Sequence, residues 1–430
     1  MMDTPNRRDF IVTAGAAAAA AAMGPVTMAT PRRKNPLEML NIGIVGTGGR
    51  GTGACNDTLT ANKDVRLVAM SDLNMQKCQS ARDNLAKAHG DRVAVEDSKM
   101  HGGLDGYLEV INDPNVDLVL LTTSPGFRPQ HVEEAVKAKK HVFAEKPVCI
   151  DPAGYRACRN AHAMAEEQGT AIVTGTQYRR QDNYVDAIRM IHEGVIGEPV
   201  TATGRYCGTG IWYRPRQEGQ TDAEYQLNNW MHFIWLSGDQ IAEQAVHNID
   251  VMNWAMNSTP ERAFGSGGRF TRPDDSEMWD SMSVDYDYPG GKLVSFMCRQ
   301  LPDATVDVDN VIYCTEGTCY IKAINGGSRI VDKNGREIYS APGNIGAAYR
   351  QEHKDLVESI KAGSPIVELN QTADSSLTAA MGRMASYTGK EVTWEFVTEK
   401  SKLDTFPKDL TLESSLPSNG YAVPGTTKPT

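Results

Sequence analysis

The sequence lacks the residue clusters on which several large classes of protein depend. Its 8 cysteines are scattered through 430 residues, with no Cys-x-x-Cys pair and no Cys/His group at zinc-ligand spacing. We therefore expect no metal site. Positive charge is also scarce, since 44 Lys and Arg stand against 54 Asp and Glu for a net charge of −10. This balance argues against nucleic acid as the main partner, because phosphate binding requires basic patches.

What is present is the composition of a globular protein, with 40% hydrophobic and 23% charged residues. A chain of 430 residues exceeds one ordinary hydrophobic core, so we expect two domains. Most cysteines are expected to be buried free thiols. Cys314 and Cys319 are close enough in sequence to pair across a hairpin, and their spacing leaves that pairing open.

Residues 1–36 are predicted to form an export signal and linker. The paired Arg7 and Arg8 precede an alanine-rich run, Ala14–Ala22, which is too short for a confident membrane span. This order is typical of a twin-arginine signal, with a plausible cleavage site at Thr27–Ala29. An N-terminal alanine helix and an uncleaved anchor are the alternatives. We expect a periplasmic or otherwise exported protein with no membrane partner beyond export.

Residues 37–180 alternate between strand and helix patterns, which predicts a doubly wound parallel sheet of the Rossmann type. The expected strands are apolar runs at Leu40–Val45, Arg66–Ser71, Leu118–Thr122, Val142–Ala144 and Ala171–Thr174. The expected helices are Gly51–Thr60, Asn74–His89, Pro129–Ala138 and Pro152–Gln168.

The pattern changes after residue 180. Residues 181–415 are predicted to form an α/β domain with a large, mostly antiparallel open sheet. Its expected strands are Thr201–Cys207, Arg262–Gly268, Ser281–Tyr288, Lys292–Arg299, Asn310–Thr315 and Thr318–Ala323. Gln351–Ala362 and Ser375–Thr388 are expected to be closing helices. Residues 416–430, rich in Ser, Pro, Gly and Thr, are predicted to be an extended arm or disordered.

A glycine-rich motif follows the first strand and predicts a dinucleotide site. Its residues are Gly46, Thr47, Gly48, Gly49, Arg50 and Gly51. Glycines at this spacing permit a tight turn and let the backbone approach a pyrophosphate at a helix N-terminus. Asp72 ends the next strand, where a carboxylate accepts hydrogen bonds from both ribose hydroxyls and repels a 2′-phosphate. The predicted cofactor is therefore NAD; a glycine turn with an Asp helix cap is the alternative.

Two loops that leave later strands are expected at the same edge of the sheet. Thr122–Pro125, with Thr123, Ser124 and Pro125, is predicted to lie along the nicotinamide ribose. Glu145-Lys146-Pro147 follows the strand ending at Ala144, and the proline favours an extended conformation at Lys146. The Lys146 ammonium is then expected to stabilise alkoxide character on a substrate hydroxyl.

The segment Gln240–Trp254 carries the candidate proton acceptor. In a continuous helix Glu243 and His247 are four residues apart and Asp250 lies one turn further, so all three would share one side. A histidine beside carboxylates is a good proton acceptor. A helix-face histidine with a structural role is the alternative.

These motifs together resemble the glucose–fructose oxidoreductase/inositol dehydrogenase/MocA (Gfo/Idh/MocA) family. The matching stretches are Asn41–Gly51, Val142–Pro147 and His247–Asp250. The resemblance implies a Rossmann domain followed by an α/β domain, with the Lys146 and His247 side chains at the substrate hydroxyl. It also implies a homo-oligomer built through the C-terminal sheet. Family members close to inositol dehydrogenase have an Asp four residues before the histidine, where this chain has Glu243.

The predicted activity is transfer of a hydride between nicotinamide and a hydroxyl of a sugar or cyclitol. Two alternatives stay open, a redox-neutral NAD-dependent glycosidase that keeps and recycles its cofactor, and a non-catalytic NAD-bound sugar-binding protein. Further candidates for substrate contact, beside Lys146 and His247, are Tyr178, Arg179, Trp230, His232 and Asp250. His232 and Tyr178 are also the alternatives to His247 as the base.

Overall fold

A computed structural model describes residues 39–418 and 420–428 of the chain. The predicted twin-arginine signal, residues 1–36, lies outside the described residues, as do the last two residues of the predicted arm. In the described part, no helix is both long and apolar enough to cross a bilayer.

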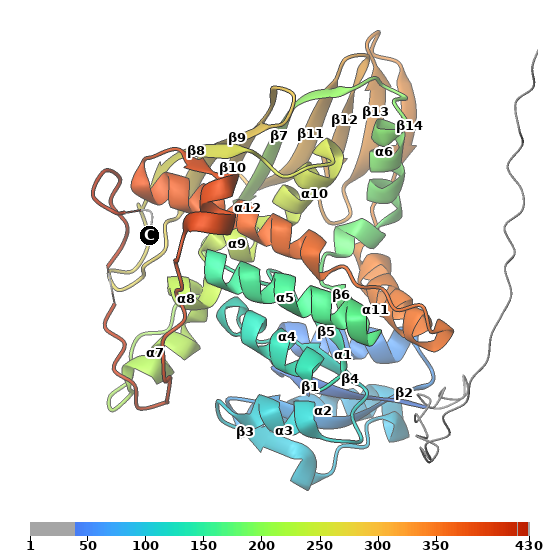
Figure 1. The fold of residues 1–430 in the computed structure, drawn as a ribbon, viewed down its shortest axis with the longest axis vertical. Coiled ribbons are helices and arrows are strands. Elements are labelled where there is room, and N and C mark those ends of the chain that lie inside the picture. Colours follow the sequence, from blue (N-terminus) through green and yellow to red (C-terminus); the bar gives the residue numbers. More distant parts are fainter. Residues whose placement is uncertain (1–38, 419, 429–430) are drawn as a thin grey trace, which may run out of the picture. The chain divides into compact units, whose positions relative to one another are not determined.

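The first half of the described chain forms a six-stranded sheet in the order β3-β2-β1-β4-β5-β6 (Figure 1). All of its pairings are parallel. The strands are β1 (Leu40–Val45), β2 (Val65–Asp72), β3 (Met100–Gly102), β4 (Leu118–Leu121), β5 (His141–Ala144) and β6 (Ile172–Thr174). The predicted Rossmann architecture is confirmed; the short strand β3 and the helix Gly106–Asn112 that follows it were not expected.

Helices cover both faces of this parallel sheet. They are α1 (Gly49–Ala61), α2 (Met75–His89), α3 (Gly106–Asn112), α4 (Arg128–Lys137) and α5 (Pro152–Gln168). The strand side chains are apolar on both faces, and they divide between one cluster shared with α1 and α2 and another shared with α3, α4 and α5. Since every strand is parallel, the loops that follow β1, β2, β4 and β5 gather at one edge of the sheet.

The second sheet has nine strands in the order β14-β13-β12-β11-β7-β10-β9-β8-β15. Every pairing is antiparallel except that of β7 with β10, which confirms the predicted mostly antiparallel sheet. Its strands are β7 (Pro199–Gly208), β8 (Arg262–Gly268), β9 (Ser281–Tyr288), β10 (Lys292–Gln300), β11 (Asp307–Cys314), β12 (Gly317–Lys322), β13 (Gly327–Asp332), β14 (Glu337–Ala341) and β15 (Val392–Thr393).

Helices from the second half of the chain link the two sheets. They are α6 (Asp182–His192), α7 (Asp222–Asn228), α8 (Ile234–Ser237), α9 (Gln240–Glu243), α10 (Val246–Met256), α11 (Ile345–Ala362) and α12 (Leu369–Thr388). Helix α11 packs on α1, and α12 contacts both α5 and strands β8 and β9 (Figure 1). Both sheets belong to one compact unit. The domain boundary between residues 180 and 181 therefore stays a prediction.

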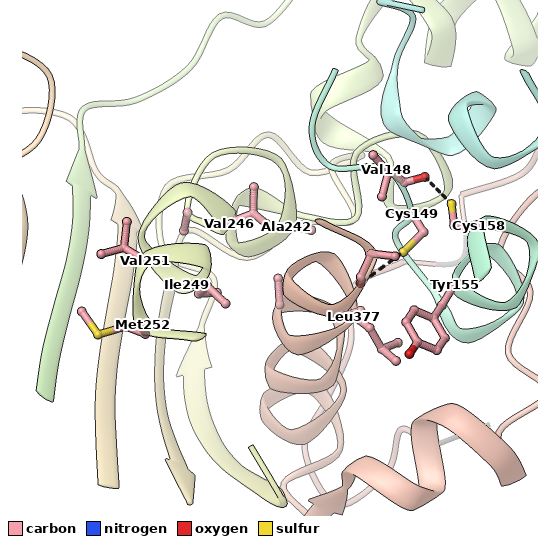
Figure 2. Close-up of a cluster of buried hydrophobic side chains, with 14 of the residues drawn as sticks. Val148, Cys149, Tyr155, Cys158, Ala242, Val246, Ile249, Val251, Met252 and Leu377 are labelled. Carbon is pink, nitrogen blue, oxygen red and sulfur yellow. Dashed lines mark hydrogen bonds between the residues drawn. The ribbon is translucent and has the colours of Figure 1, made fainter. Parts of the chain in front are cut away.

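The core continues from one sheet to the other. Figure 2 shows Val148 and Cys149, from the segment after β5, and side chains of α5 in one cluster with Leu377 of α12 and apolar residues of α9 and α10. Two thiols hydrogen-bond to main-chain carbonyls there, Cys158 to Val148 and Cys149 to Ala373 (Figure 2). Since α9 and α10 share this core, the position of His247 relative to Lys146 depends on packing across both sheets.

Three details of the structure differ from the sequence-based expectations or decide between alternatives that the sequence left open. Residues 240–254 do not form one helix, because α9 ends at Glu243 and α10 begins at Val246. The cysteines at 314 and 319 are free thiols, and the β11–β12 register places Cys319 opposite Ile312. The described part of the tail is an extended arm, held by hydrogen bonds such as that from Trp279 Nε1 to the Ala422 carbonyl at 3.2 Å.

Candidate functional site

The glycine loop between β1 and α1 has the shape that a pyrophosphate needs. Gly46 has a φ of 93°, and a Cβ on Gly51 would lie 1.9 Å from the Gly46 carbonyl oxygen. Both positions therefore require glycine. Gly48 and Gly49 face open space instead, since a Cβ on either of them would meet nothing within 4 Å. The phosphates of a dinucleotide would fit in this open space at the start of α1.

Asp72 lies beside the glycine loop at the end of β2. Its Oδ2 accepts a hydrogen bond from the Thr47 backbone N–H at 2.8 Å and faces the Thr47 hydroxyl at 3.3 Å. Its Oδ1 accepts from the Asn74 N–H at 3.0 Å. The carboxylate thus fixes the loop and also lines a cavity of about 210 Å³ together with Gly46 and Gly48. That position fits the predicted contact with ribose hydroxyls.

Aromatic side chains form much of the far wall of this cavity. They are Tyr107, Phe127, His131 and Trp230. The His131 ring stacks on Tyr107 with centroids 4.1 Å apart, and burial together with the nearby Arg128 lowers the pKa of His131 to about 3. His131 is therefore a neutral aromatic surface. Sequence reasoning found Trp230 but missed the other three, because isolated aromatics after a strand have no distinctive spacing.

The loop after β4 also reaches the cavity. Thr123 and Ser124 line it, and the Thr123 hydroxyl lies 3.3 Å from His131 Nδ1. Pro125 is buried and begins a short 3₁₀ helix, Pro125–Phe127. The predicted position of this loop beside the dinucleotide cavity fits the geometry, while its contact with the nicotinamide ribose stays a prediction.

Lys146 follows β5 and reaches the break between α9 and α10. Its Nζ donates to the Glu243 carbonyl at 2.5 Å and lies 3.5 Å from Glu243 Oε1. In a continuous helix that carbonyl would accept from the N–H of His247, which here points to the Gln244 carbonyl at 3.5 Å instead. The interruption of the helix thus frees an acceptor for Lys146.

His247 lies in the first turn of α10 and remains partly accessible. Its pKa is well below the ordinary value of 6.5, because burial disfavours the imidazolium and the positive charges of Lys146 and Arg50 lie nearby. Its ring is 5.4 Å from that of Tyr178, and no described residue hydrogen-bonds to it. A neutral imidazole with free nitrogens is a competent proton acceptor.

A network of charges supports the base of the site. Glu145 Oε1 accepts from Arg50 Nε at 2.7 Å, and the Arg50 guanidinium lies 4.4 Å from the ring centre of Tyr349. Arg50 and Glu145 were predicted to bind the cofactor, and here they contact each other. Nearby Glu352 is fully buried and has no hydrogen-bond partner among the described residues, and its pKa is well above the usual value because of burial and the nearby Glu145.

Three predicted substrate contacts, Asp250, Arg179 and His232, already have partners within the protein. Asp250 forms a buried ion pair with Arg179 at 2.8 and 2.9 Å and accepts from the Ser375 hydroxyl. His232 is buried, with Nδ1 3.0 Å from Ser276 Oγ and Nε2 2.9 Å from the Trp212 carbonyl. Their polar atoms have partners, so these residues shape the site from behind.

Tyr178 is also buried rather than open to substrate. Its hydroxyl accepts from the Ile324 N–H at 3.3 Å, and its ring stacks on Tyr184 with centroids 4.4 Å apart. Burial raises the pKa of Tyr178. It contacts the site as a flat surface behind His247. Within residues 39–418 and 420–428, no three His, Cys, Asp or Glu side chains gather where they could share a metal ion.

Comparisons with known proteins agree with this arrangement. Residues 40–176 match the model of an oxidoreductase family with an NAD-binding Rossmann fold, and residues 184–320 match the GFO/IDH/MocA C-terminal domain. The chain is 27% identical over 219 residues to inositol 2-dehydrogenase of Salmonella paratyphi B, a match that covers 51% of this chain and 55% of that enzyme. It is 24% identical to myo-inositol 2-dehydrogenase of Thermotoga maritima over 76% of this chain and 90% of that enzyme.

A solved levoglucosan dehydrogenase, in complex with NADH and levoglucosan, superposes with a TM-score of 0.64 at 15% identity. The superposition covers 82% of this chain and 99% of that one, which shows a shared fold. The two family models together span most of both sheets. The glycine loop, Asp72 and the cavity beside them are consistent with NAD, the cofactor of the matched Rossmann domain. This protein belongs to the Gfo/Idh/MocA family of NAD-binding oxidoreductases.

Proposed function

We propose that the protein is an NAD-dependent oxidoreductase acting on a secondary hydroxyl of a sugar or cyclitol. The observation that carries this proposal is the pairing of a neutral, unpartnered His247 with the Lys146 ammonium at the sheet edge that also holds the glycine loop. The substrate class rests on the names of the relatives, two inositol dehydrogenases and a levoglucosan dehydrogenase.

Each residue has one task in the proposed reaction. When bound, NAD⁺ accepts the two electrons and the hydrogen of the carbinol C–H bond, so the alcohol becomes a ketone and the cofactor becomes NADH. His247 takes the hydroxyl proton, because its imidazole is neutral and no described residue hydrogen-bonds to its ring nitrogens. Lys146 holds the oxygen as it gains negative charge. Glu243 keeps Lys146 in place through its main-chain carbonyl.

The direct test is to add candidate cyclitols and monosaccharides to the holoprotein and to follow the NADH absorbance band. A net increase with one of them, absent from a Lys146→Met variant, supports the proposal. A substrate that binds without any change in absorbance, and without release of a product, would instead indicate a sugar-binding protein.

One observation favours a redox-neutral glycosidase as a second candidate. Leu227, Asn228 and Trp230 line the cofactor cavity, and α7 is held there by hydrogen bonds from Thr221 to the Leu412 carbonyl and from Gln226 to the Leu416 carbonyl, at the start of the C-terminal arm. A cofactor retained in this way could be reduced and reoxidised within one turnover. Release of an aglycone from a glycoside, with no net NADH, would identify this activity.

The proposal includes export by the twin-arginine route with NAD already bound. Support comes from Arg7, Arg8 and the following alanine-rich run, and from the little free NAD expected outside the cytoplasm. The test is to recover the processed protein from the periplasm and to analyse its denatured extract for nucleotide. Processed protein without nucleotide contradicts export of the holoprotein, and unprocessed cytoplasmic protein contradicts export itself.

The proposal also includes a homo-oligomer formed through the outer face of the nine-stranded sheet. That face exposes large apolar side chains on four strands, namely Val200, Phe264, Leu293, Met297 and Tyr313. Exposed apolar patches of this kind indicate interaction sites. Light scattering should give a mass above one chain, and a Leu293→Lys/Met297→Lys variant should be monomeric. A monomeric wild type contradicts this part.

A further inference from the structure

Arg128 is an almost fully buried cation that anchors the loops on either side of it. It begins α4, directly after the 3₁₀ helix Pro125–Phe127, and is 1% exposed. Its Nη1 donates to the carbonyls of Glu145 at 2.5 Å, Lys146 at 3.2 Å and Pro147 at 3.1 Å. Its Nη2 donates to the Thr123 carbonyl.

These four carbonyls belong to two different parts of the site. Glu145, Lys146 and Pro147 form the turn that carries the proposed oxyanion-binding ammonium. Thr123 belongs to the loop that lines the dinucleotide cavity. The two segments follow β5 and β4, which are neighbours in the sheet. A single planar guanidinium therefore fixes the distance between the lysine turn and the cofactor loop, which the sheet itself leaves free beyond the last paired residues, Ala144 and Leu121.

The positive charge of Arg128 is buried without an ion pair to any carboxylate among the described residues. Its hydrogen bonds all go to main-chain carbonyls. Burial lowers the pKa of Arg128 to about 10, against the opposing effect of Glu145 and Glu243. The side chain is still charged at neutral pH. Burying a cation without an ion pair costs free energy. In this protein that cost falls at the contact between two loops of the site.

We infer that Arg128 is a positioning residue that sets the Lys146 ammonium relative to the cofactor loop. This inference rests on the proposed function and deepens it, because it adds a residue that touches neither substrate nor cofactor. Lys146 is held at both ends, its main chain by Arg128 and its Nζ by the Glu243 carbonyl. Loss of Arg128 frees the turn while leaving the glycine loop, Asp72 and His247 unchanged.

The test uses the full-length holoprotein and three variants. Arg128→Met removes the cation but keeps an unbranched side chain of similar length. Arg128→Lys keeps the charge, yet an ammonium lacks the planar fork that spans both loops. Arg92→Met is the matched control, since Arg92 also donates to two main-chain carbonyls, those of Leu59 and Asn62, at the opposite end of α1.

We expect kcat of Arg128→Met to fall by about 10²-fold, the effect of a small misplacement of a catalytic group, with a smaller rise in KM for NAD because the Thr123 loop also loses its anchor. Arg128→Lys should fall less, and Arg92→Met should keep wild-type kcat even if its melting temperature drops. The second readout needs no turnover. Competitive acylation of lysines over a pH series, read by mass spectrometry, should show a changed reactivity of Lys146 in Arg128→Met and an unchanged one in Arg92→Met.

The outcomes separate this inference from the proposed function. If wild type oxidises no polyol, the proposed function fails, and Lys146 reactivity alone decides the inference. If kcat or Lys146 reactivity in folded Arg128→Met equals that of wild type, the inference is overturned. If Arg128→Met does not fold, the same two measurements on Arg128→Lys decide, since that variant retains the buried charge.

Discussion

The charges around His247 determine when its imidazole can accept a proton. Burial, Lys146 and Arg50 all favour the neutral ring and lower its pKa well below 6.5. Asp250, the carboxylate expected to raise that pKa, is instead paired with Arg179. The residue is therefore a base that stays unprotonated at neutral pH, and the first two predictions at this scale depend on it.

The pH dependence is the first of these. The acidic limb of kcat/KM for alcohol oxidation should lie well below pH 6.5, because the free enzyme keeps His247 neutral there. Stability follows the same group. The unfolded chain binds more protons between the folded pKa and about 6.5, so the contribution of His247 to stability is complete above pH 6.5 and is lost as pH falls. A pH–rate profile and acid titration of His247→Ala, which should lack both effects, check this.

Lys146 and His247 should behave as one catalytic unit. General-base assistance is worth roughly 10²–10⁴-fold, and loss of an oxyanion-stabilising donor costs on the order of 10²–10³-fold. Lys146→Met and His247→Ala should each lower turnover by such factors and leave NAD affinity almost unchanged. The double variant should lose less than the product of the two, because residues acting together are non-additive. Wild-type turnover in His247→Ala would assign the base elsewhere.

Asp72 should determine the preference for NAD over NADP. Asp72→Ala should weaken NAD binding and narrow the gap to NADP, since the carboxylate both repels a 2′-phosphate and fixes the Thr47 N–H. Asp72→Asn separates the two effects, because an amide oxygen still accepts from Thr47 but carries no charge. Fluorescence titration with both cofactors measures this; equal affinity of wild type for NADP and NAD would contradict the assignment.

At the scale of elements, the close approach of α1 to the glycine loop limits what can replace Gly51. Gly51→Ala should abolish most NAD binding, because its Cβ would meet the Gly46 carbonyl at 1.9 Å and push the helix away. Gly53→Ala, two residues further in the same helix, has nothing nearer than 3.8 Å. That control should bind NAD normally and gain about 0.5–1 kcal/mol in stability. NAD titration and thermal melting distinguish the two variants.

The break between α9 and α10 is a second feature that belongs to the scale of elements. A sequence period predicts a continuous helix through residues 240–254, and nothing in the residues between Glu243 and Val246 is a strong helix breaker. The interruption is visible only when α9 is packed against α12 and α10 against β7. The interruption leaves the Glu243 carbonyl free to accept a hydrogen bond from Lys146. The periodicity of the sequence does not predict it.

For the whole molecule, the segment that leads into the C-terminal arm links the second half of the chain to the cofactor cavity. Thr405 binds Asp151 at the start of α5, and the Phe406 ring contacts both Phe127 and Trp235. Phe127 lines the dinucleotide cavity. This segment therefore supports one wall of the cavity, a contact that its local sequence does not indicate.

Phe406→Ala should raise the dissociation rate of NAD. The change removes support from Phe127 and should destabilise the protein by less than the ~3–5 kcal/mol of a fully buried Phe, since Phe406 is only half-buried. Tyr421→Ala is the control, because Tyr421 lies further along the chain under Arg269 and is 52% exposed. Stopped-flow displacement of NADH measures the rates. Equal rates in wild type and Phe406→Ala would show that this segment does not retain the cofactor.

The sequence by itself determined the Rossmann half, the glycine loop, Asp72 and the placement of Lys146 after β5. These depend on signals that are local or regular, such as glycine spacing, apolar strand runs and the parallel order that brings strand ends together. Only the tertiary structure decided which partners the polar side chains take. Asp250 with Arg179, His232 with Ser276, Lys146 with Glu243 and Arg128 with Thr123 were not predicted, because hydrogen bonds depend on distances of a few tenths of an ångström that packing sets.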